Sequence, residues 1–362
     1  MKQNYYKSTS LLLLCFPLMV TAKNSFFSKE KVEKSVHKAF EVNPNALVEI
    51  NNSFGDVNII TWENNQVVID ITIKVSGRSQ KKIDERLESI SIQFQNNPDK
   101  VSAKTIIEKN WQWSWFGSYQ QTDFEINYDI KMPRNNALEL RNDYGAVILD
   151  KIDGNTAIHC DYGQVIIGEL RGEKNTLSFD YSSNSSIDYI NIGTIHADYS
   201  GFELGVANRL ELKADYTSSK IEKVGHLDFN TDYGKLTVNQ AEKVFGNGDY
   251  ITLRFGSIQK QLDLETDYGS IRIDHIQSTA ETIRVKSDYT SVRLGISPQW
   301  DFNFDLDLEY AGFKTDLPIT YKKEILDNTE KQYLGYYRNE ASTNKLTVTA
   351  DYGSLKILRP DN

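Results

Sequence analysis

The dipeptide Asp-Tyr recurs at a nearly constant interval from residue 142 onward in this 362-residue chain. Aligned on that pair, the segments include NDYGAVILD from Asn142, TDYGKLTVN from Thr231 and TDYGSIRID from Thr266. The aspartates stand at positions 143, 161, 180, 198, 215, 232, 249, 267 and 288, in steps of 18, 19, 18, 17, 17, 17, 18 and 21 residues. A period this regular indicates a repeat architecture, because units so short bury an apolar face only by stacking on one another.

Apolar residues alternate within each period. They stand 4 and 6 positions after the aspartate, as at Ile271 and Ile273, and 5 and 3 positions before the next one, as at Leu262 and Leu264. Alternation with period two indicates β-strands with one buried face. Stacked about 4.8 Å apart, such strands form parallel sheets around a continuous core. The sequence therefore predicts an all-β fold, a parallel β-solenoid of about 18 residues per turn. The right-handed preference of parallel crossovers favours a right-handed β-helix.

The Asp-Tyr pair is predicted to form a corner of each turn. Counting the alternation forward from the preceding strand points the tyrosine inward, whereas counting backward from the following strand points it outward, so its direction stays open. The residue after the tyrosine is Thr217, Ile251 or Thr290 in some turns, so a left-handed backbone is not required there. We expect the aspartate to accept a hydrogen bond from a backbone amide in the bend, as in an Asx-turn.

We also expect eleven tyrosines to stack turn over turn into an aromatic column. Asp180-Tyr181 and Glu309-Tyr310 belong to this series in an imperfect context. The other members of the predicted corner column are Asp143, Tyr144, Asp161, Tyr162, Asp198, Tyr199, Asp215, Tyr216, Asp232, Tyr233, Asp249, Tyr250, Asp267, Tyr268, Asp288, Tyr289, Asp351 and Tyr352. One interpretation makes the column an acidic rail for divalent cations. Repeated turn chemistry with aromatic packing is the interpretation we prefer.

The chain before the regular repeats divides into three predicted segments. Residues 1–22 give a signal peptide, with Lys2 and Lys7 before an apolar run and a small-residue cleavage site ending at Ala22. Residues 23–61 contain a first solenoid turn, with Phe54 in the tyrosine position. Residues 62–135 are predicted to cap the N-terminal end of the stack with strands and one short helix. Residues 136–362 hold the repeats, with a loop insertion near 318–344.

The signal peptide predicts export, to the periplasm, the cell surface or the medium. The alternative, an uncleaved anchor, is disfavoured because the ten apolar residues from Leu11 to Val20 are too few to span a bilayer. We expect no transmembrane segment after signal removal. The mature chain would keep Cys160 alone, so we expect no intramolecular disulfide and a buried thiol.

Charge and motif content narrow the possible functions. The formal net charge is −9, and loss of Lys2 and Lys7 makes it −9 − 2 = −11, which disfavours a nucleic-acid partner. His159 and His196 share a column but should lie two turns apart, too far for one metal ion. Nothing in the sequence marks an acid–base pair or a nucleophile motif, so we predict no catalytic residue, no metal and no cofactor.

Two aromatic clusters are candidate ligand-binding sites. Three tryptophans alternate in NWQWSWFGSYQQT and point to one side of a strand or hairpin, where they either bind a sugar or partner or close over the end of the core. A second cluster is predicted on a loop near the C-terminus. The candidate residues are Trp111, Trp113, Trp115, Tyr119, Tyr333, Tyr336 and Tyr337.

The segment PNALVEINNSFGDVNIITW, the helix-bearing insert, the Met132-Pro133 strand end and the DYG turns together resemble the bacterial "putative adhesin" β-solenoid families of unknown function, described as like autotransporter adhesin heads. The resemblance covers nearly all of the mature chain. It implies an exported right-handed β-helix and no known catalytic residues.

Three functions follow as hypotheses. The first is an exported non-enzymatic scaffold that binds an envelope glycan or surface protein. The second is a polysaccharide lyase or hydrolase built on a β-helix. The third is an envelope-stress signalling partner. The sequence does not indicate the oligomeric state.

Overall fold

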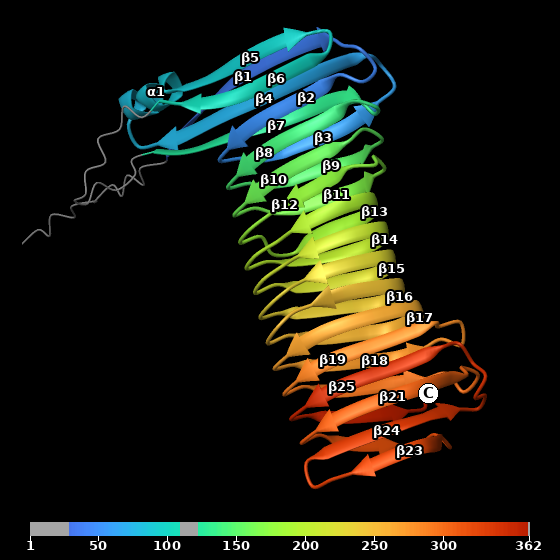
Figure 1. Cartoon of the computed structure of the whole chain (residues 1–362). Coiled ribbons are helices and arrows are strands. Elements are labelled where there is room, and N and C mark those ends of the chain that lie inside the picture. The colour runs from blue at the N-terminus through green and yellow to red at the C-terminus, as the bar shows by residue number, and fades with distance from the viewer. Residues whose placement is uncertain (1–28, 109–121, 361–362) are drawn as a thin grey trace, which may run out of the picture.

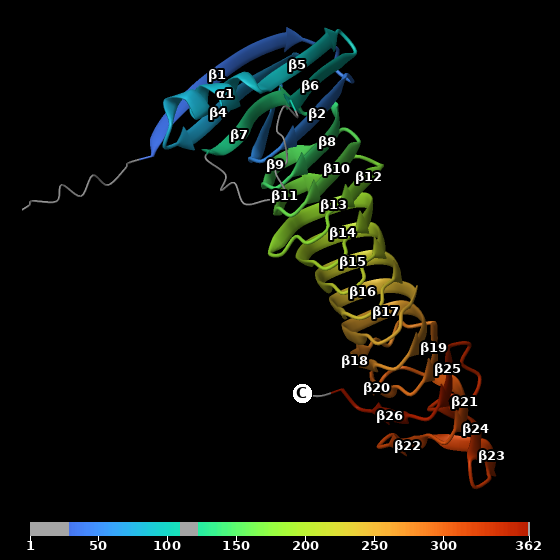
Figure 2. The ribbon, with the colours of Figure 1, turned by 90° about the vertical axis from the view of Figure 1, so that its left-hand side faces the viewer.

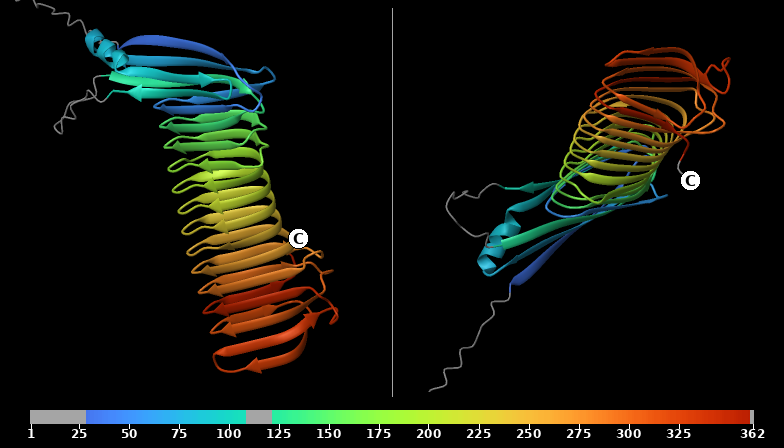
Figure 3. Two further views of the ribbon diagram at one scale, coloured as in Figure 1. Left: turned by 45° about the horizontal axis from the view of Figure 1, so that its top comes forward. Right: turned by 90° about the horizontal axis from the view of Figure 1, so that it is seen from below.

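The computed structural model describes residues 29–108 and 122–360. The fold is all-β, with a long and largely parallel sheet of 26 strands, as predicted. The strands stack into an elongated column with a broader N-terminal end (Figure 1). Seen along its length, the chain coils around a single core (Figure 3). We call each layer of this stack a rung.

The elements run in three groups along the chain. The N-terminal group consists of β1 (Glu30–Glu41), β2 (Leu47–Ser53), β3 (Val57–Trp62), β4 (Gln66–Gly77), α1 (Gln80–Glu88), β5 (Ile90–Asn97), β6 (Lys100–Ile107) and β7 (Thr122–Pro133). The stacked group consists of β8 (Ala137–Asp143), β9 (Val147–Ile152), β10 (Thr156–Asp161), β11 (Val165–Leu170), β12 (Asn175–Ser178), β13 (Ser185–His196), β14 (Gly201–Lys213), β15 (Ser218–Asn230), β16 (Lys235–Asn247), β17 (Thr252–Asp267), β18 (Ser270–Ile276), β19 (Thr282–Asp288) and β20 (Ser291–Ile296). The C-terminal group consists of β21 (Phe302–Glu309), β22 (Gly312–Thr315), β23 (Thr320–Leu326), β24 (Glu330–Tyr337), β25 (Lys345–Asp351) and β26 (Ser354–Leu358).

Neighbouring rungs pair in parallel and in register with the repeat. Leu227 in β15 pairs with Val244 in β16, and Leu253 in β17 pairs with Ile271 in β18. All four of these side chains are at most 1% exposed. Columns of like apolar side chains therefore form the core, and the alternation in the sequence is confirmed by the alternating burial of β14 to β20.

The N-terminal group adds antiparallel pairing to the first rung. β2 lies between β6 and β8, and β3 lies between β7 and β9, all in parallel pairs. Beyond these, β7, β4 and β1 pair antiparallel, as do β6 and β5 (Figure 2). The amphipathic segment after Ser79 forms α1, which buries Ile83. No helix of the described residues has the length and apolar character needed to cross a membrane.

The C-terminal group departs from chain order. β25 lies between β19 and β21, pairing in parallel with both. In the same way, β26 lies between β20 and β22 (Figure 2). The chain thus passes over one rung position after β20 and returns to occupy it with residues 345–358. β24 and β23 extend the end of the stack as antiparallel strands.

Candidate functional site

The most regular exposed feature is the aromatic column. Phe54 and eleven tyrosines stack face to face, with ring centroids 4.8–5.2 Å apart and ring planes within 8° of parallel. The predicted stacking is confirmed, including Phe54 as its first member. Tyr352 stacks between Tyr289 and Tyr310, so the column follows the order of rungs and not the order of the chain.

The structure resolves the direction of the tyrosines. Each is about half exposed, between 48% for Tyr233 and 53% for Tyr144, so the column faces solvent. Every one of them has a positive φ, between 48° and 61°. Cys160 and Val165 stand five positions apart on either side of the corner, so strict alternation would place them on opposite faces. Both are buried, because the left-handed tyrosine between them reverses the alternation. Thr217, Ile251 and Thr290 are not among the residues with positive φ, as expected.

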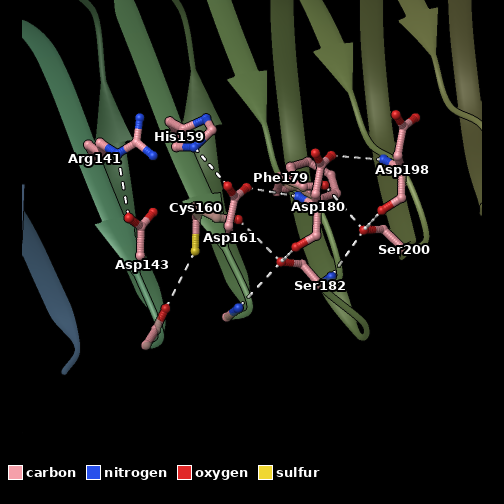
Figure 4. A network of polar contacts seen from close by, with 12 residues as sticks. Arg141, Asp143, His159, Cys160, Asp161, Phe179, Asp180, Ser182, Asp198 and Ser200 are labelled. Atoms are coloured by element: carbon pink, nitrogen blue, oxygen red, sulfur yellow. Dashed lines mark hydrogen bonds and ion pairs between the residues drawn. The ribbon is translucent and has the colours of Figure 1, made fainter. Parts of the chain in front are cut away.

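The aspartates bond across rungs and not within their own bend, which corrects the Asx-turn expectation. The amide of Asp180 donates to Oδ1 of Asp161 at 3.2 Å, and the amide of Asp198 donates to Oδ1 of Asp180 at 3.1 Å (Figure 4). The same bond recurs at every rung from Asp215 to Asp288. In the opposite direction, the amide of Tyr162 donates to the Asp180 carbonyl at 3.0 Å. From Asp161 to Asp288, each corner is therefore joined to the next by a pair of hydrogen bonds.

The stacked rings limit what the column offers to a ligand. Their faces cover one another, so the surface presents ring edges and phenol hydroxyls. Burial first, and then the neighbouring Tyr181 and Tyr144, raise the pKa of the Tyr162 phenol, and Tyr199 shows a raised pKa for the same kinds of reason. These hydroxyls therefore stay protonated near neutral pH and act as neutral hydrogen-bond donors and acceptors.

A groove of about 760 Å³ lies beside the column, on the face made by the strand segments that precede each Asp-Tyr corner. A volume of this order is typical of ligand sites. Its lining mixes both signs of charge with amides and two aromatic residues, Phe229 and Phe245. The polar side chains that line it include Arg209, Glu211, Lys213, Asp228 and Asn230.

Contacts in the groove hold its polar groups in place. Nε2 of His226 lies 3.0 Å from Oδ2 of Asp228, and the His226 ring stacks on Phe245 with centroids 5.3 Å apart. Nδ2 of Asn230 donates to Oδ1 of Asn247 at 2.6 Å. Mixed charges, amides and an aromatic edge are groups that hydrogen-bond and contact a polyhydroxylated ligand.

Asp143, His159 and Asp161 form the one group of three ligand-type side chains that the described ranges bring within metal-binding distance, with candidate atoms within 4.8 Å of one another. These groups already engage protein partners. Nε2 of His159 lies 3.0 Å from Oδ2 of Asp161, and Arg141 lies 3.5 Å from Asp143 (Figure 4). His159 and His196 lie on different rungs, both paired in register with Ser178.

The thiol of Cys160 is fully buried, as expected. Burial, with the negative charge of Asp161 and Asp143, raises its pKa to about 12. A neutral thiol enclosed by the core is unreactive.

The predicted aromatic clusters have different outcomes. Trp111, Trp113, Trp115 and Tyr119 lie outside the described residues. Tyr333, Tyr336 and Tyr337 lie on strand β24, so the expectation of a loop is wrong. Tyr333 is 8% exposed and Tyr337 6%, and they pack on Phe313 and Phe302 respectively. Tyr336 is the more accessible of the three.

Comparisons with known proteins return structural likenesses alone. No family model and no curated protein matches the chain. A "putative adhesin" from Parabacteroides merdae has 10% sequence identity and a TM-score of 0.32, covering 90% of this chain and 96% of its own. A "putative cell adhesion protein" from Clostridium sporogenes has 11% identity and a TM-score of 0.17, covering 91% and 100%. A "putative lipid binding protein" from Parabacteroides distasonis has 8% identity and a TM-score of 0.28, covering 89% and 96%.

The description "putative adhesin" of the Parabacteroides merdae protein is the one borne by the families that the sequence resembles. Identities this low define no ligand and no site for this chain.

Proposed function

We propose that this protein is an exported, non-enzymatic β-solenoid scaffold that binds a glycan or surface protein of the cell envelope. The observation that carries the proposal is the groove on the strand face before the Asp-Tyr corners, where charged side chains and amides lie on one face of the stack. Regular stacking supports this function, because each rung holds its outward side chains at a fixed spacing without mobile loops.

The proposal includes the finer architecture. We infer a right-handed coil of about 18 residues per turn, on the right-handed preference of parallel crossovers and the spacing of the aspartates. We infer that residues 62–135 cap the stack and that residues 1–22 direct export. The tryptophans 111, 113 and 115 remain a second proposed ligand site, and Tyr336 a third.

The test is binding of the chain from residue 23 to an array of envelope and extracellular glycans, with and without calcium, while product release is monitored. Arg209→Ala combined with Asn230→Ala should weaken binding at least tenfold, since one lost hydrogen bond to a charged group costs roughly 1.5 kcal/mol and about 1.4 kcal/mol corresponds to tenfold. Lys235→Ala, an exposed change on the other face of the solenoid, is the matched control and should leave binding intact.

A second arm replaces Trp111, Trp113 and Trp115 by alanine. If the tryptophan variant loses binding while the groove variant binds normally, the ligand site lies at the tryptophans and not in the groove. Release of shortened glycan would overturn the non-enzymatic assignment and support the lyase or hydrolase hypothesis.

A further inference from the structure

One oxygen of the aspartate column lacks the bond that its equivalents have. Oδ1 of each corner aspartate from Asp161 to Asp267 accepts the backbone amide of the aspartate on the next rung. Oδ1 of Asp143 is enclosed by protein and has no hydrogen-bond partner among the described residues. The bond that joins the rungs from Asp161 to Asp288 is therefore missing between Asp143 and Asp161.

An enclosed carboxylate oxygen without a partner is unfavourable, because burial removes water that no hydrogen bond replaces. In a native structure, a bound water molecule or ion is one explanation for such an atom. Arg141 does not supply the partner, since its Nε lies 3.5 Å from the other oxygen, Oδ2 of Asp143, beyond ordinary hydrogen-bond length. The side chains beside Oδ1 decide between water and an ion.

Two further side chains of metal-ligand type lie beside Asp143. His159 and Asp161 stand on the next rung, where β10 pairs in register with β8 and Asp161 is the direct partner of Asp143. One candidate ligand atom from each of the three residues lies within 4.8 Å of the other two, and Figure 4 shows the three side chains on adjacent rungs. All three are partly shielded from solvent, between 23% and 32% exposed.

The contacts that these side chains already make are compatible with an ion. Oδ1 of Asp161 accepts the Asp180 amide, which leaves Oδ2 of Asp161 as its ligand atom. Nε2 of His159 lies 3.0 Å from that Oδ2, close to the separation of about 3.3 Å between two ligand atoms of one Zn²⁺ ion. An ion can therefore replace this hydrogen bond with little movement of either side chain.

The charge of the group also favours a cation. Among the described residues, Arg141 is the arginine or lysine that contacts either carboxylate. Two carboxylates and one guanidinium leave a net negative charge. The Arg141 side chain is 52% exposed, so it can turn toward water when a second cation binds.

The ligand types are those of zinc. One imidazole nitrogen and two carboxylate oxygens bind Zn²⁺ in a tetrahedral arrangement that leaves the fourth position to water or another ligand. Ca²⁺ takes about six to eight oxygen ligands and fits less well. Arg141 and His159 also line a depression of about 320 Å³, through which a ligand can reach the fourth position.

We propose that Oδ1 of Asp143, Nε2 of His159 and Oδ2 of Asp161 bind one Zn²⁺ ion. The ion bridges β8 and β10 where the hydrogen bond between the aspartates is missing. This site departs from the sequence-based prediction of no metal, because one of its ligands comes from a different rung. None of the three residues lines the groove, so this proposal and the glycan proposal can fail independently.

The test is calorimetric titration of Zn²⁺ into the chain from residue 23, freed of metal with a chelator, and into the variants Asp143→Ala and His159→Gln. We expect the unchanged chain to bind Zn²⁺ and each variant to bind it at least about tenfold more weakly. An equal concentration of Ca²⁺ should not displace the ion. Zn²⁺ should also raise the thermal unfolding midpoint of the unchanged chain more than that of either variant, because the site exists only in the folded state.

His226→Gln is the matched control. Nε2 of His226 also lies 3.0 Å from an aspartate two residues later in the chain, at Oδ2 of Asp228, but no third ligand completes that pair within the described ranges. This variant should bind Zn²⁺ like the unchanged chain. Circular dichroism of each variant checks that the fold is retained, and the partly exposed His159 keeps the test valid if Asp143→Ala does not fold.

Four outcomes would overturn the proposal. The first is absence of Zn²⁺ binding by the unchanged chain. The second is an unchanged Zn²⁺ affinity in a folded Asp143→Ala or His159→Gln variant, which would place the ion elsewhere. The third is an equal loss in His226→Gln. The fourth is displacement of Zn²⁺ by an equal concentration of Ca²⁺, which would indicate a site made of oxygen ligands alone.

Discussion

The backbone amide of Asp249 donates a 2.7 Å hydrogen bond to Oδ1 of Asp232, one rung away. Asp232 in turn donates its own amide to Oδ1 of Asp215 at 2.9 Å. The repeated aspartate therefore serves as an acceptor for the next layer. Its periodic occurrence is explained by this bond and by the tyrosine that follows it.

Replacing Asp232 should test this role directly. Asp232→Ala leaves the Asp249 amide without its partner and should lower the free energy of unfolding by about 1 to 2 kcal/mol. Asp232→Asn keeps an oxygen at the same place and should recover most of the loss. Urea denaturation followed by circular dichroism measures both. Asp263→Ala removes an exposed ion pair with Arg284 at 3.5 Å and should cost under about 0.5 kcal/mol. Equal effects of Asp232→Ala and Asp263→Ala would refute the cross-rung role.

Tyr233 tests the left-handed corner. Its φ is 54°, a conformation that costs a residue with a side chain about 1–2 kcal/mol and costs glycine little. Both Tyr233→Ala and Tyr233→Gly lose the stacking with Tyr216 and Tyr250, so their difference reports on the backbone. We expect Tyr233→Gly to unfold at a higher urea midpoint than Tyr233→Ala.

Tyr233→Phe is the control for the hydroxyl. It keeps the ring, as Phe54 does naturally, and should match the unchanged chain in stability. An alanine variant at least as stable as the glycine variant would contradict the strained corner.

Two aspartates should respond to pH with opposite signs. Burial first, and then the negative charge of Asp288 and Asp249, raise the pKa of Asp267 above its ordinary 3.8. The folded state therefore disfavours the ionised form, and this penalty is relieved as pH falls through the raised pKa toward 3.8. Asp267→Asn should thus be more stable than the unchanged chain at pH 7, and the difference should shrink in that window.

Asp274 provides the contrast. Burial raises its pKa, but hydrogen bonds from Arg272 and Arg254 outweigh burial and hold the pKa below 3.8. Its stabilising effect is present above 3.8 and is lost as pH falls through the lower folded value. Asp274→Asn should therefore be less stable at pH 7. Urea midpoints at pH 7 and pH 4 for both variants measure the signs, and the same sign for both would contradict the assignment.

The inserted strands at the C-terminus give a further prediction. A chain ending at residue 341 lacks β25 and β26, so β19 and β21 lose the strand that pairs with both. We expect rapid amide exchange over residues 302–337 and unchanged protection over residues 201–247. A peptide of residues 343–360 added in trans should restore the protection, and a scrambled peptide should not. Full protection in the shortened chain would contradict the pairing.

Much of the fold could be predicted from the sequence, because equivalent residues of successive repeats pair with one another and so set the parallel register. Val238 and Phe255 occupy equivalent positions, pair in β16 and β17, and are both buried, as the alternation requires. The role of Phe54 followed from the same register. The outward direction of the tyrosines could not be predicted in this way. The alternation of inward and outward side chains breaks at the Asp-Tyr pair, and the left-handed backbone of the tyrosine sets which way its side chain points.

The order of the last rungs could not be predicted from the sequence either. The step from Asp288 to Glu309 is 21 residues, which fits the next rung, yet Asp351 pairs with Asp288. All rungs pair through the same backbone hydrogen bonds, so a segment from later in the chain can pair with β19 as well as the segment that follows directly in the sequence. For the same reason, the pairing of Lys314 with Lys356 could not be predicted from their positions in the sequence.

Because β25 and β26 lie between strands that precede them in the chain, the rungs cannot assemble in the order in which they are synthesised. Rungs up to β20 can be added as the chain emerges, since each pairs with material already made. The rung of β21 and β22 has no place to dock until residues 345–358 have arrived. A chain whose translation or translocation stops early therefore leaves two unsatisfied strand edges, and only the finished polypeptide can close the stack.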